Sequence, residues 1–218
     1  MRIEGAVFDL DGTLTDTEKL QFEGWAEVLR DIEVVLDKKK YFKYAGKTGT
    51  IVDRELIEDH GLDVEPGTLK MRKEKLLIEW LNSRSIELMP FAMEAVGFFR
   101  ERSIPVAVAT GAPIEQVTPK LTRTGLKDMF DAVVTRSDVK NGKPHPETYL
   151  KACKLIGIEP GKCVAFEDTI GGAMSAKDAG LICIAVPTDL TEGQNFSFTD
   201  YVTKDLRDAI EWVKSKMD

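Results

Sequence analysis

The sequence predicts an α/β protein whose core is a parallel sheet with helices on both faces, into which a smaller all-helical domain is inserted. Two observations carry this prediction. Short apolar runs alternate with segments of helical periodicity over most of the chain, and residues 16–84 interrupt that alternation with helical patterns alone. Alternating strands and helices are typical of a parallel sheet, because each crossover helix packs on one of its faces.

Five apolar runs have the length and composition of buried strands. They are residues 3–8, 106–109, 132–135, 163–166 and 181–186. Helical patterns lie beside them at residues 91–102, 113–124, 146–157 and 169–179. Folds of this class bind their ligands beyond the carboxyl ends of the strands. The polar clusters that follow the first, second and fourth runs therefore mark the expected site.

Residues 16–84 contain no convincing strand. Apolar residues recur at helical spacing near residues 22–29, 51–57 and 69–80. A helical insertion of this length can bury an apolar face of its own. We therefore expect a core domain of residues 1–15 and 85–218 and a separate helical domain of residues 16–84.

Composition disfavours several classes of protein. The 218 residues carry a formal net charge of −7, whereas a nucleic-acid-binding protein needs clustered Lys and Arg for the phosphate backbone. The three cysteines are odd in number and fit no zinc-ligand spacing, so we expect reduced thiols. We find no signal peptide and no apolar run of the ~18–20 residues that span a bilayer, so we expect a cytoplasmic protein without a membrane partner.

Asp9 and Asp11 stand two residues apart directly after the first predicted strand, where Gly12 permits a sharp turn. Two unpaired carboxylates at a buried strand end are costly, and a divalent cation would relieve that cost. Ligands that are all oxygen suit Mg²⁺. The alternative interpretation is structural, since the same pattern forms an Asx turn with a helix cap.

Glu167 and Asp168 follow the fourth predicted strand and precede a helix. Asp168 by itself could be a simple N-cap of that helix. Because the carboxyl ends of parallel strands meet at one edge of a sheet, the two acidic pairs could also converge on one cation.

Thr110, Gly111 and Ala112 follow another predicted strand and precede a helix, where a hydroxyl and free N–H groups bind phosphate well. A plain helix cap explains the same residues equally well. Lys143 lies in a stiff turn before a further helix and would supply a point charge for phosphate. Taken alone, that lysine is more typical of an ordinary surface.

Four segments, in this order along the chain, resemble the four signature motifs of the haloacid dehalogenase-like superfamily of hydrolases. They are FDLDGTLTDTE at 8–18, VATGA at 108–112, the lysine of NGKPHPETYL at 141–150 and FEDTIGGAMSAKDAG at 166–180. The pattern is most similar to the subgroup of β-phosphoglucomutases and small sugar- or polyol-phosphate phosphatases. The resemblance implies a Rossmann-like core and identifies the helical insertion with the family's small cap domain.

The resemblance also implies catalytic and metal-binding roles. Asp9 would be the nucleophile that forms an aspartyl-phosphate, and Asp11 would be the general acid and then the general base. Mg²⁺ would be held by the Asp9 carboxylate, the backbone carbonyl of Asp11 and Asp168. Glu167 would support that metal site directly or through water.

Phosphate binding follows from the same resemblance. Thr110, with the backbone N–H groups of Gly111 and Ala112 nearby, and Lys143 would bind the phosphoryl oxygens. Such a site suits phosphoryl transfer, in which positioning and electrostatics dominate.

In the predicted cap, Gly46, Lys47, Thr48 and Gly49 form a glycine-rich turn between two helices, and this turn could contact the leaving group. The alternative is an ordinary turn between helices. By analogy with the fold, side chains of the cap would determine the substrate, so the sequence alone does not identify it.

The sequence therefore predicts a Mg²⁺-dependent phosphatase, expected as a monomer, that acts on a small phosphorylated metabolite such as a sugar or polyol phosphate. The alternative is a phosphomutase of the β-phosphoglucomutase type, which the hinge at residues 15–18 resembles. Gln21 stands where such mutases usually carry histidine, and the turn at 45–49 resembles the phosphatases. A binding protein on a retired enzyme scaffold is disfavoured by the intact core motifs.

Overall fold

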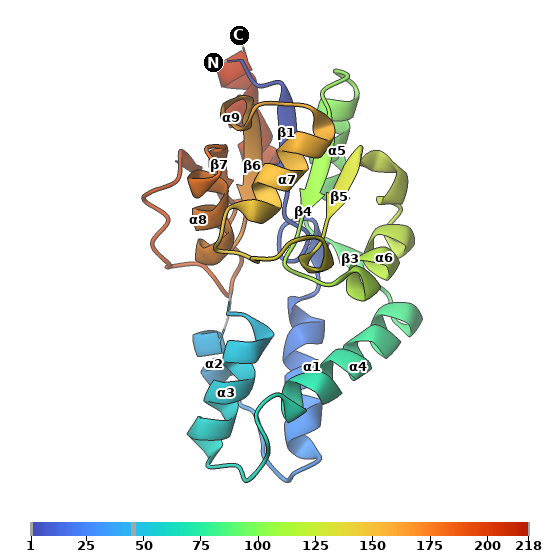
Figure 1. Ribbon diagram of the computed structural model, residues 1–218, viewed down its shortest axis with the longest axis vertical. Helices are drawn as coiled ribbons and strands as arrows, with labels where there is room; N and C mark the ends of the chain where they lie inside the picture. Colours follow the sequence, from blue (N-terminus) through green and yellow to red (C-terminus); the bar gives the residue numbers. More distant parts are fainter. Residues whose placement is uncertain (1, 45–46, 218) are drawn as a thin grey trace. The chain divides into compact units, whose positions relative to one another are not determined.

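The computed structural model describes residues 2–44 and 47–217 (Figure 1). The chain divides into two compact units, Met1–Asp16 with Ile86–Asp218, and Thr17–Ser85. We call the first unit the core and the second the cap, and describe each by itself.

The core contains a six-stranded sheet in the order β5-β4-β1-β6-β7-β8, and every pair of neighbouring strands is parallel. The strands are β1 (Gly5–Phe8), β4 (Val106–Ala109), β5 (Ala132–Val134), β6 (Cys163–Glu167), β7 (Ile182–Ala185) and β8 (Tyr201–Val202). Each of the five predicted apolar runs coincides with one of the first five strands, and β6 extends one residue beyond its run, to Glu167. The edge strand β8 was not predicted, because two residues carry no recognisable pattern.

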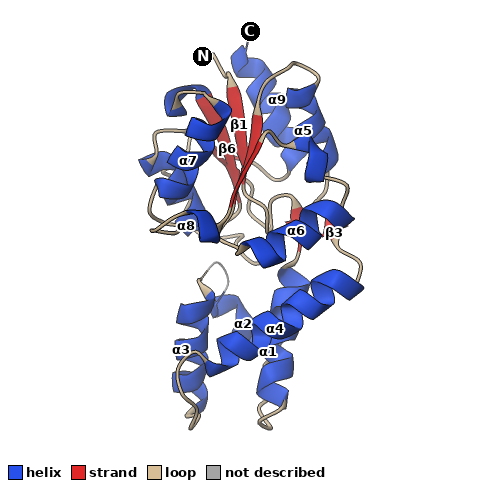
Figure 2. Ribbon diagram, turned by 45° about the vertical axis from the view of Figure 1, so that its right-hand side comes forward, coloured by secondary structure: helices blue, strands red, loops and turns tan. Residues whose placement is uncertain are grey.

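Helices cover both faces of this sheet, as the predicted fold requires. They are α5 (Ala92–Arg100), α6 (Ile114–Arg123), α7 (Glu147–Ile156), α8 (Ile170–Asp178) and α9 (Leu206–Met217). Figure 2 shows α7 and α8 on one side of the strands and α5 and α9 on the other. Short 3-10 turns complete the core at Lys127–Met129, Arg136–Asp138 and Pro160–Lys162.

Side chains that alternate between the two faces of the strands form one hydrophobic core on each face of the sheet. Phe8 points toward α5, α6 and α9 and stacks on Phe166 of the neighbouring strand, with ring centroids 4.4 Å apart. Val7 points to the opposite face, where it packs with apolar residues of α7 and α8. Because successive side chains of a strand face opposite sides, both faces of each central strand are apolar, as expected for a buried parallel sheet.

Two short antiparallel strands, β2 (Thr15–Asp16) and β3 (Glu87–Leu88), pair with each other. β2 lies where the chain leaves the core, and β3 lies where the chain returns to it. The N–H of Met89 also donates to the carbonyl of Leu14, at 2.9 Å. This pair was not predicted, since two-residue strands lack any periodicity.

The cap is built from the helices α1 (Glu18–Arg30), α2 (Lys38–Tyr41), α3 (Gly49–His60) and α4 (Thr68–Ser83), with a 3-10 turn at Phe42–Tyr44. Asp53 is buried and accepts hydrogen bonds from the N–H groups of Gly67 and Lys70, at 2.6 and 2.7 Å, which fixes the start of α4 against α3. The helical character predicted for this segment is confirmed. Among the described residues of the chain, none of the helices is both long and apolar enough to cross a bilayer.

Candidate active site

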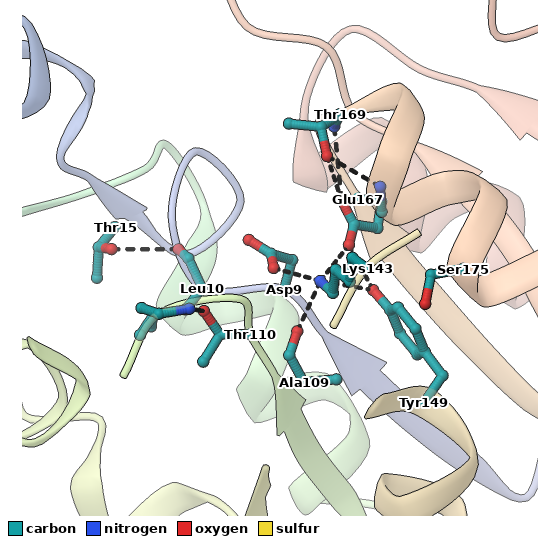
Figure 3. A network of polar contacts seen from close by, with 12 residues as sticks. Asp9, Leu10, Thr15, Ala109, Thr110, Lys143, Tyr149, Glu167, Thr169 and Ser175 are labelled. Atoms are coloured by element: carbon teal, nitrogen blue, oxygen red, sulfur yellow. Dashed lines mark hydrogen bonds and ion pairs between the residues drawn. The ribbon is translucent and has the colours of Figure 1, made fainter. Parts of the chain in front are cut away.

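Asp9 lies directly beyond the carboxyl end of β1, at the centre of the sheet. Its backbone N–H donates to the carbonyl of Phe166 on β6, at 3.0 Å, so the backbone ladder holds the residue although β1 has ended. Its side chain is buried and accepts a hydrogen bond from the Lys143 ammonium group, with 2.6 Å between Nζ and Oδ1 (Figure 3). The parallel sheet thus presents one carboxylate at the expected edge.

The loop after Asp9 is tight and fully hydrogen-bonded. The carbonyl of Leu10 accepts the N–H groups of Leu14 and Thr15, both at 2.9 Å, and the Thr15 hydroxyl at 3.1 Å. Gly12 adopts a φ of +79°, and a Cβ atom there would overlap the carboxylate of Asp168. Glycine is therefore required both for the turn and for the close approach of β1's loop to the Asp168 side chain.

Three acidic side chains meet at this edge. Carboxylate oxygens of Asp9, Glu167 and Asp168 lie within 4.8 Å of one another, and all three residues are buried. The two acidic strand ends predicted to converge therefore do so. The carboxylate of Asp11 is not part of this group and instead forms an ion pair with Lys120 of α6, at 2.5 Å.

Lys143 is the cation inside this acidic group. Its Nζ donates to Asp9, to Glu167 and, at 2.8 Å, to the backbone carbonyl of Ala109 at the end of β4. The loop that carries it is held from two sides. Glu147 accepts the N–H groups of Lys140 and Asn141 at 2.8 and 2.9 Å.

On the other side of that loop, the hydroxyl of Ser175 on α8 donates to the carbonyl of His145, at 2.8 Å. Both anchors use hydrogen-bonding groups that belong to the helices following the loop and β6. The two flanking helices therefore hold the Lys143 loop in place. An ordinary surface lysine would not need such anchoring.

Burial and charge alter the protonation of this pair. Burial is the strongest influence on Asp9 and raises the pKa of its carboxyl to about 7, although the nearby Lys143 ammonium group favours the ionised form. Burial by itself lowers the pKa of Lys143, but the Asp9 and Glu167 carboxylates outweigh it and hold that pKa above its usual range. Lys143 is accordingly a permanent cation, while Asp9 needs further positive charge to be fully ionised at neutral pH.

Tyr149 and Thr169 orient Glu167, and neither was predicted. The phenol of Tyr149, fully buried in α7, donates to Oε1 of Glu167 at 2.7 Å, and the Thr169 hydroxyl donates to Oε2 at 3.2 Å. Thr169 also accepts the N–H of Gly172 at 3.1 Å as the N-cap of α8. The sequence shows Tyr149 only as one apolar position of a helix, because its partner lies on another element.

The loop after β4 contains the predicted phosphate-binding residues. Thr110 is buried, and its Oγ1 accepts the N–H of Ala112 at 3.0 Å, which closes a small turn. Gly111, between them, is exposed, with no side chain or backbone atom near the position of a Cβ. The N–H of Ala112 is therefore engaged within the loop, whereas the Thr110 hydroxyl keeps its own hydrogen for another acceptor.

The glycine-rich turn of the cap is described in part. Gly46 lies outside the described residues. Lys47 forms an ion pair with Glu55 of α3 at 2.8 Å, and Thr48 is the extended residue that precedes α3. Gly49 begins that helix. Lys47 and Thr48 are exposed.

The acidic group fits a hard divalent cation. Its donors are carboxylate oxygens only, they come from two neighbouring strand ends, and one of them approaches the backbone so closely that only glycine fits at position 12. Oxygen-only donor sets favour Mg²⁺, Ca²⁺ and Mn²⁺ over softer metals.

The chain is similar to known proteins over most of its length. The family model described as haloacid dehalogenase-like hydrolase matches residues 3–180. A validoxylamine A 7'-phosphate phosphatase of Streptomyces hygroscopicus subsp. limoneus is 29% identical over 213 residues, which cover 95% of each chain. The fructose-1-phosphate phosphatase YqaB of Escherichia coli is 32% identical over 185 residues, which cover 85% of this chain and 97% of the relative.

Solved structures share the fold. The crystal structure of CbbY from Rhodobacter sphaeroides in complex with phosphate superposes with a TM-score of 0.81 at 24% identity, covering 94% of this chain and 95% of the other. The similarity therefore extends over nearly the whole of both chains.

Proposed function

The chain belongs to the haloacid dehalogenase-like hydrolases, in their subgroup of β-phosphoglucomutases and sugar-phosphate phosphatases, and from this premise we propose that it is a Mg²⁺-dependent phosphatase of small sugar or polyol phosphates. One observation carries the proposal. Asp9, Lys143 and the adjacent pair Glu167 and Asp168 come from three separate segments of the sequence and meet at the carboxyl ends of β1 and β6.

The charge of this group explains why a cation belongs to the activity. Three carboxylates face one ammonium group, so a phosphate dianion would be repelled. When bound, Mg²⁺ neutralises that charge and polarises the phosphoryl oxygens. Asp9, Asp168 and the backbone carbonyl of Asp11 would hold it, with Glu167 in support.

The chain's own residues then account for the chemistry. A carboxylate oxygen of Asp9 attacks the phosphorus atom, the bond from phosphorus to the leaving oxygen breaks, and the Asp11 carboxyl gives its proton to that oxygen. Lys143 and Thr110 bind the phosphoryl oxygens, together with the backbone N–H of Gly111. The result is an aspartyl-phosphate on Asp9 and a free alcohol.

Hydrolysis follows the same geometry in reverse. The Asp11 carboxylate takes a proton from water, the water oxygen attacks phosphorus, and the bond from phosphorus to Asp9 breaks. Phosphate leaves, and both aspartates return to their starting states. Asp11 thus acts as general acid in the first step and as general base in the second.

The substrate class is supported by the relatives rather than by the geometry of the core. Two relatives that match most of this chain are, by their names, phosphatases of validoxylamine A 7'-phosphate and of fructose 1-phosphate. The second name gives a sugar phosphate as the substrate of that relative. We therefore propose a sugar or polyol monophosphate as substrate.

The test is phosphate release from a panel of sugar, polyol and nucleotide monophosphates and glycolate phosphate, each with Mg²⁺ and with a chelator. We expect Mg²⁺-dependent release that favours one sugar or polyol phosphate at least about a hundredfold in kcat/KM, the scale that differential contacts to one hydroxylated substrate achieve. Absence of turnover across the panel contradicts the proposal. Conversion of a hexose 1-phosphate to its 6-phosphate without phosphate release assigns a mutase instead.

A further inference from the structure

Lys120 is a buried cation of the core that the proposed chemistry does not use. It lies in α6, its side chain is 0% exposed, and its Nζ is 2.5 Å from Oδ1 of Asp11. The two residues are 109 positions apart in the sequence. Lys120 thus connects α6, the helix that follows the Thr110 loop, to the loop that follows β1.

A buried ammonium group at this position is energetically unfavourable, so its presence calls for a reason. Val117 and Leu121, on the same face of α6, are buried in the main hydrophobic core, and an apolar side chain of similar length would fill the space of Lys120. Burial of a lysine ammonium group is unfavourable unless a partner compensates it, and a pair of this kind is often no more stable than packed apolar residues. Stability alone therefore gives no reason for Lys120.

The partner of Lys120 suggests the reason. Lys143 binds Asp9 and Glu167, while Lys120 binds Asp11, so separate lysines on separate elements hold the two aspartates of the loop. The side chain of Asp11 is 28% exposed and lies in a loop, whereas the stem of Lys120 is enclosed by the core. The surrounding core therefore fixes the Lys120 side chain, and Lys120 in turn orients the Asp11 carboxylate.

We propose that Lys120 is a positioning residue that fixes the direction of the Asp11 carboxyl group for proton transfer to the leaving oxygen. This inference rests on the proposed function, in which Asp11 carries that proton. Lys120 acts through Asp11 and not on the phosphoryl group, so its loss impairs the proton transfer and leaves the attack by Asp9 intact.

Substrates with different leaving groups separate these two events. The p-nitrophenolate anion leaves without a proton, whereas phenolate is more basic and benefits from protonation as its bond to phosphorus breaks. Because kcat/KM covers only the steps up to formation of the aspartyl-phosphate, the ratio of kcat/KM for p-nitrophenyl phosphate to that for phenyl phosphate reports on the proton donor. A general loss of structure lowers both values together.

The experiment measures this ratio at saturating Mg²⁺ for the wild-type chain, Lys120→Met, Asp11→Asn and Lys177→Met. Lys177 of α8 forms an ion pair with Asp200 at 2.7 Å near the surface of the core, so Lys177→Met removes a lysine from an ion pair away from Asp11. We expect Lys120→Met to raise the ratio about tenfold or more, as misplacement of a catalytic group does, and Lys177→Met to leave it unchanged. An unchanged ratio in folded Lys120→Met overturns the inference.

Two further variants keep the test decisive. Lys120→Gln retains a polar head and carries the same expectation if Lys120→Met does not fold. In the Asp11→Asn background, Lys120→Met should produce no additional change, since the group that it positions is gone. An equal change in both backgrounds overturns the inference.

The controls also separate this inference from the proposed function. Absence of Mg²⁺-dependent turnover of p-nitrophenyl phosphate by the wild-type chain contradicts the phosphatase itself. An unchanged ratio in Asp11→Asn contradicts the assignment of Asp11 as proton donor. If Asp11→Asn raises the ratio and Lys120→Met does not, only the role of Lys120 is wrong.

Discussion

Gly172, in the first turn of α8, faces Glu167 so closely that a Cβ atom built on it would overlap the whole carboxyl group. The helix start and the acidic side chain therefore occupy adjoining space, and glycine is the only residue that leaves the Glu167 carboxylate where Lys143 and Tyr149 contact it. The position of one acidic group of the candidate metal site thus depends on a residue without any chemistry of its own.

Gly172→Ala is expected to displace Glu167 and to raise the Mg²⁺ concentration needed for half-maximal activity by about tenfold, the effect typical of disturbing the surroundings of a metal site. Overpacking should also lower the free energy of unfolding by about 1–3 kcal/mol. Metal titration of phosphate release and thermal unfolding measure the two effects.

Gly171→Ala is the matched control, because nothing lies within 4 Å of a Cβ at that position of the same helix. It should stabilise the protein by about 0.5–1 kcal/mol through helix propensity and leave the Mg²⁺ requirement unchanged. Equal effects of the two alanines would show that the contact with Glu167 is irrelevant.

Tyr149→Phe removes the phenol that donates to Glu167 within the core. The remaining carboxylate loses one of its buried donors, so we expect about 1.5–3 kcal/mol lower stability, as for other hydrogen bonds to charged groups. Weaker Mg²⁺ binding should accompany it. Tyr201→Phe is the control. Tyr201 lies on the edge strand β8 and stacks on Trp212, away from the acidic group, so its substitution should change neither stability nor Mg²⁺ binding. A Tyr149→Phe protein with wild-type stability and metal dependence would contradict the proposed support of Glu167.

The pKa of Asp9 predicts how pH affects metal binding. Burial raises that pKa to about 7 in the metal-free protein, and the carboxylate must lose its proton to bind a cation. The Mg²⁺ concentration for half-maximal activity should therefore rise as pH falls below about 7, by up to about tenfold per pH unit, and should level off above about pH 8. The same Mg²⁺ concentration for half-maximal activity at pH 6 and pH 8 would contradict a raised pKa of Asp9.

The same shift has a defined effect on stability. The folded pKa of Asp9 lies above the unfolded value of about 3.9, so the folded metal-free protein binds the proton more tightly. The stability that this proton contributes is present below about pH 4 and is lost as pH rises toward about 7. Thermal unfolding of wild type and Asp9→Asn, compared between pH 5 and pH 8 with chelator, measures the contribution of this group. If the difference in stability between them does not change with pH, the raised pKa is wrong.

The sheet could be predicted because its strands are buried on both faces and are therefore continuous apolar runs. β8 could not, since it has two residues and depends on pairing with β7. α9 was missed although Leu206, Ala209, Ile210 and Val213 have helical spacing and are all buried. The helical periodicity of α9 was therefore present in the sequence.

The acidic group was predictable for a related reason. Parallel strands bring their carboxyl ends to one edge, so Asp9 and Glu167 could be expected at the same edge once the fold was assigned, and the pairing of β1 with β6 makes them neighbours. Lys120 and Tyr149 were not predicted, because a lysine or a tyrosine on an amphipathic helix has the same pattern whether or not a carboxylate faces it. Their roles depend on contacts between distant segments, which periodicity does not encode.

The central claim is that Asp9 is the nucleophile, and the most direct measurement compares phosphate release by wild type and Asp9→Asn at saturating Mg²⁺, on the best substrate of the panel. The exchange replaces the nucleophilic carboxylate by a neutral amide of low nucleophilicity and similar size. We expect a loss of about a thousandfold or more in kcat, as when a nucleophile is removed from other enzymes that form covalent intermediates. Turnover of folded Asp9→Asn close to that of wild type would contradict the role of Asp9 as nucleophile.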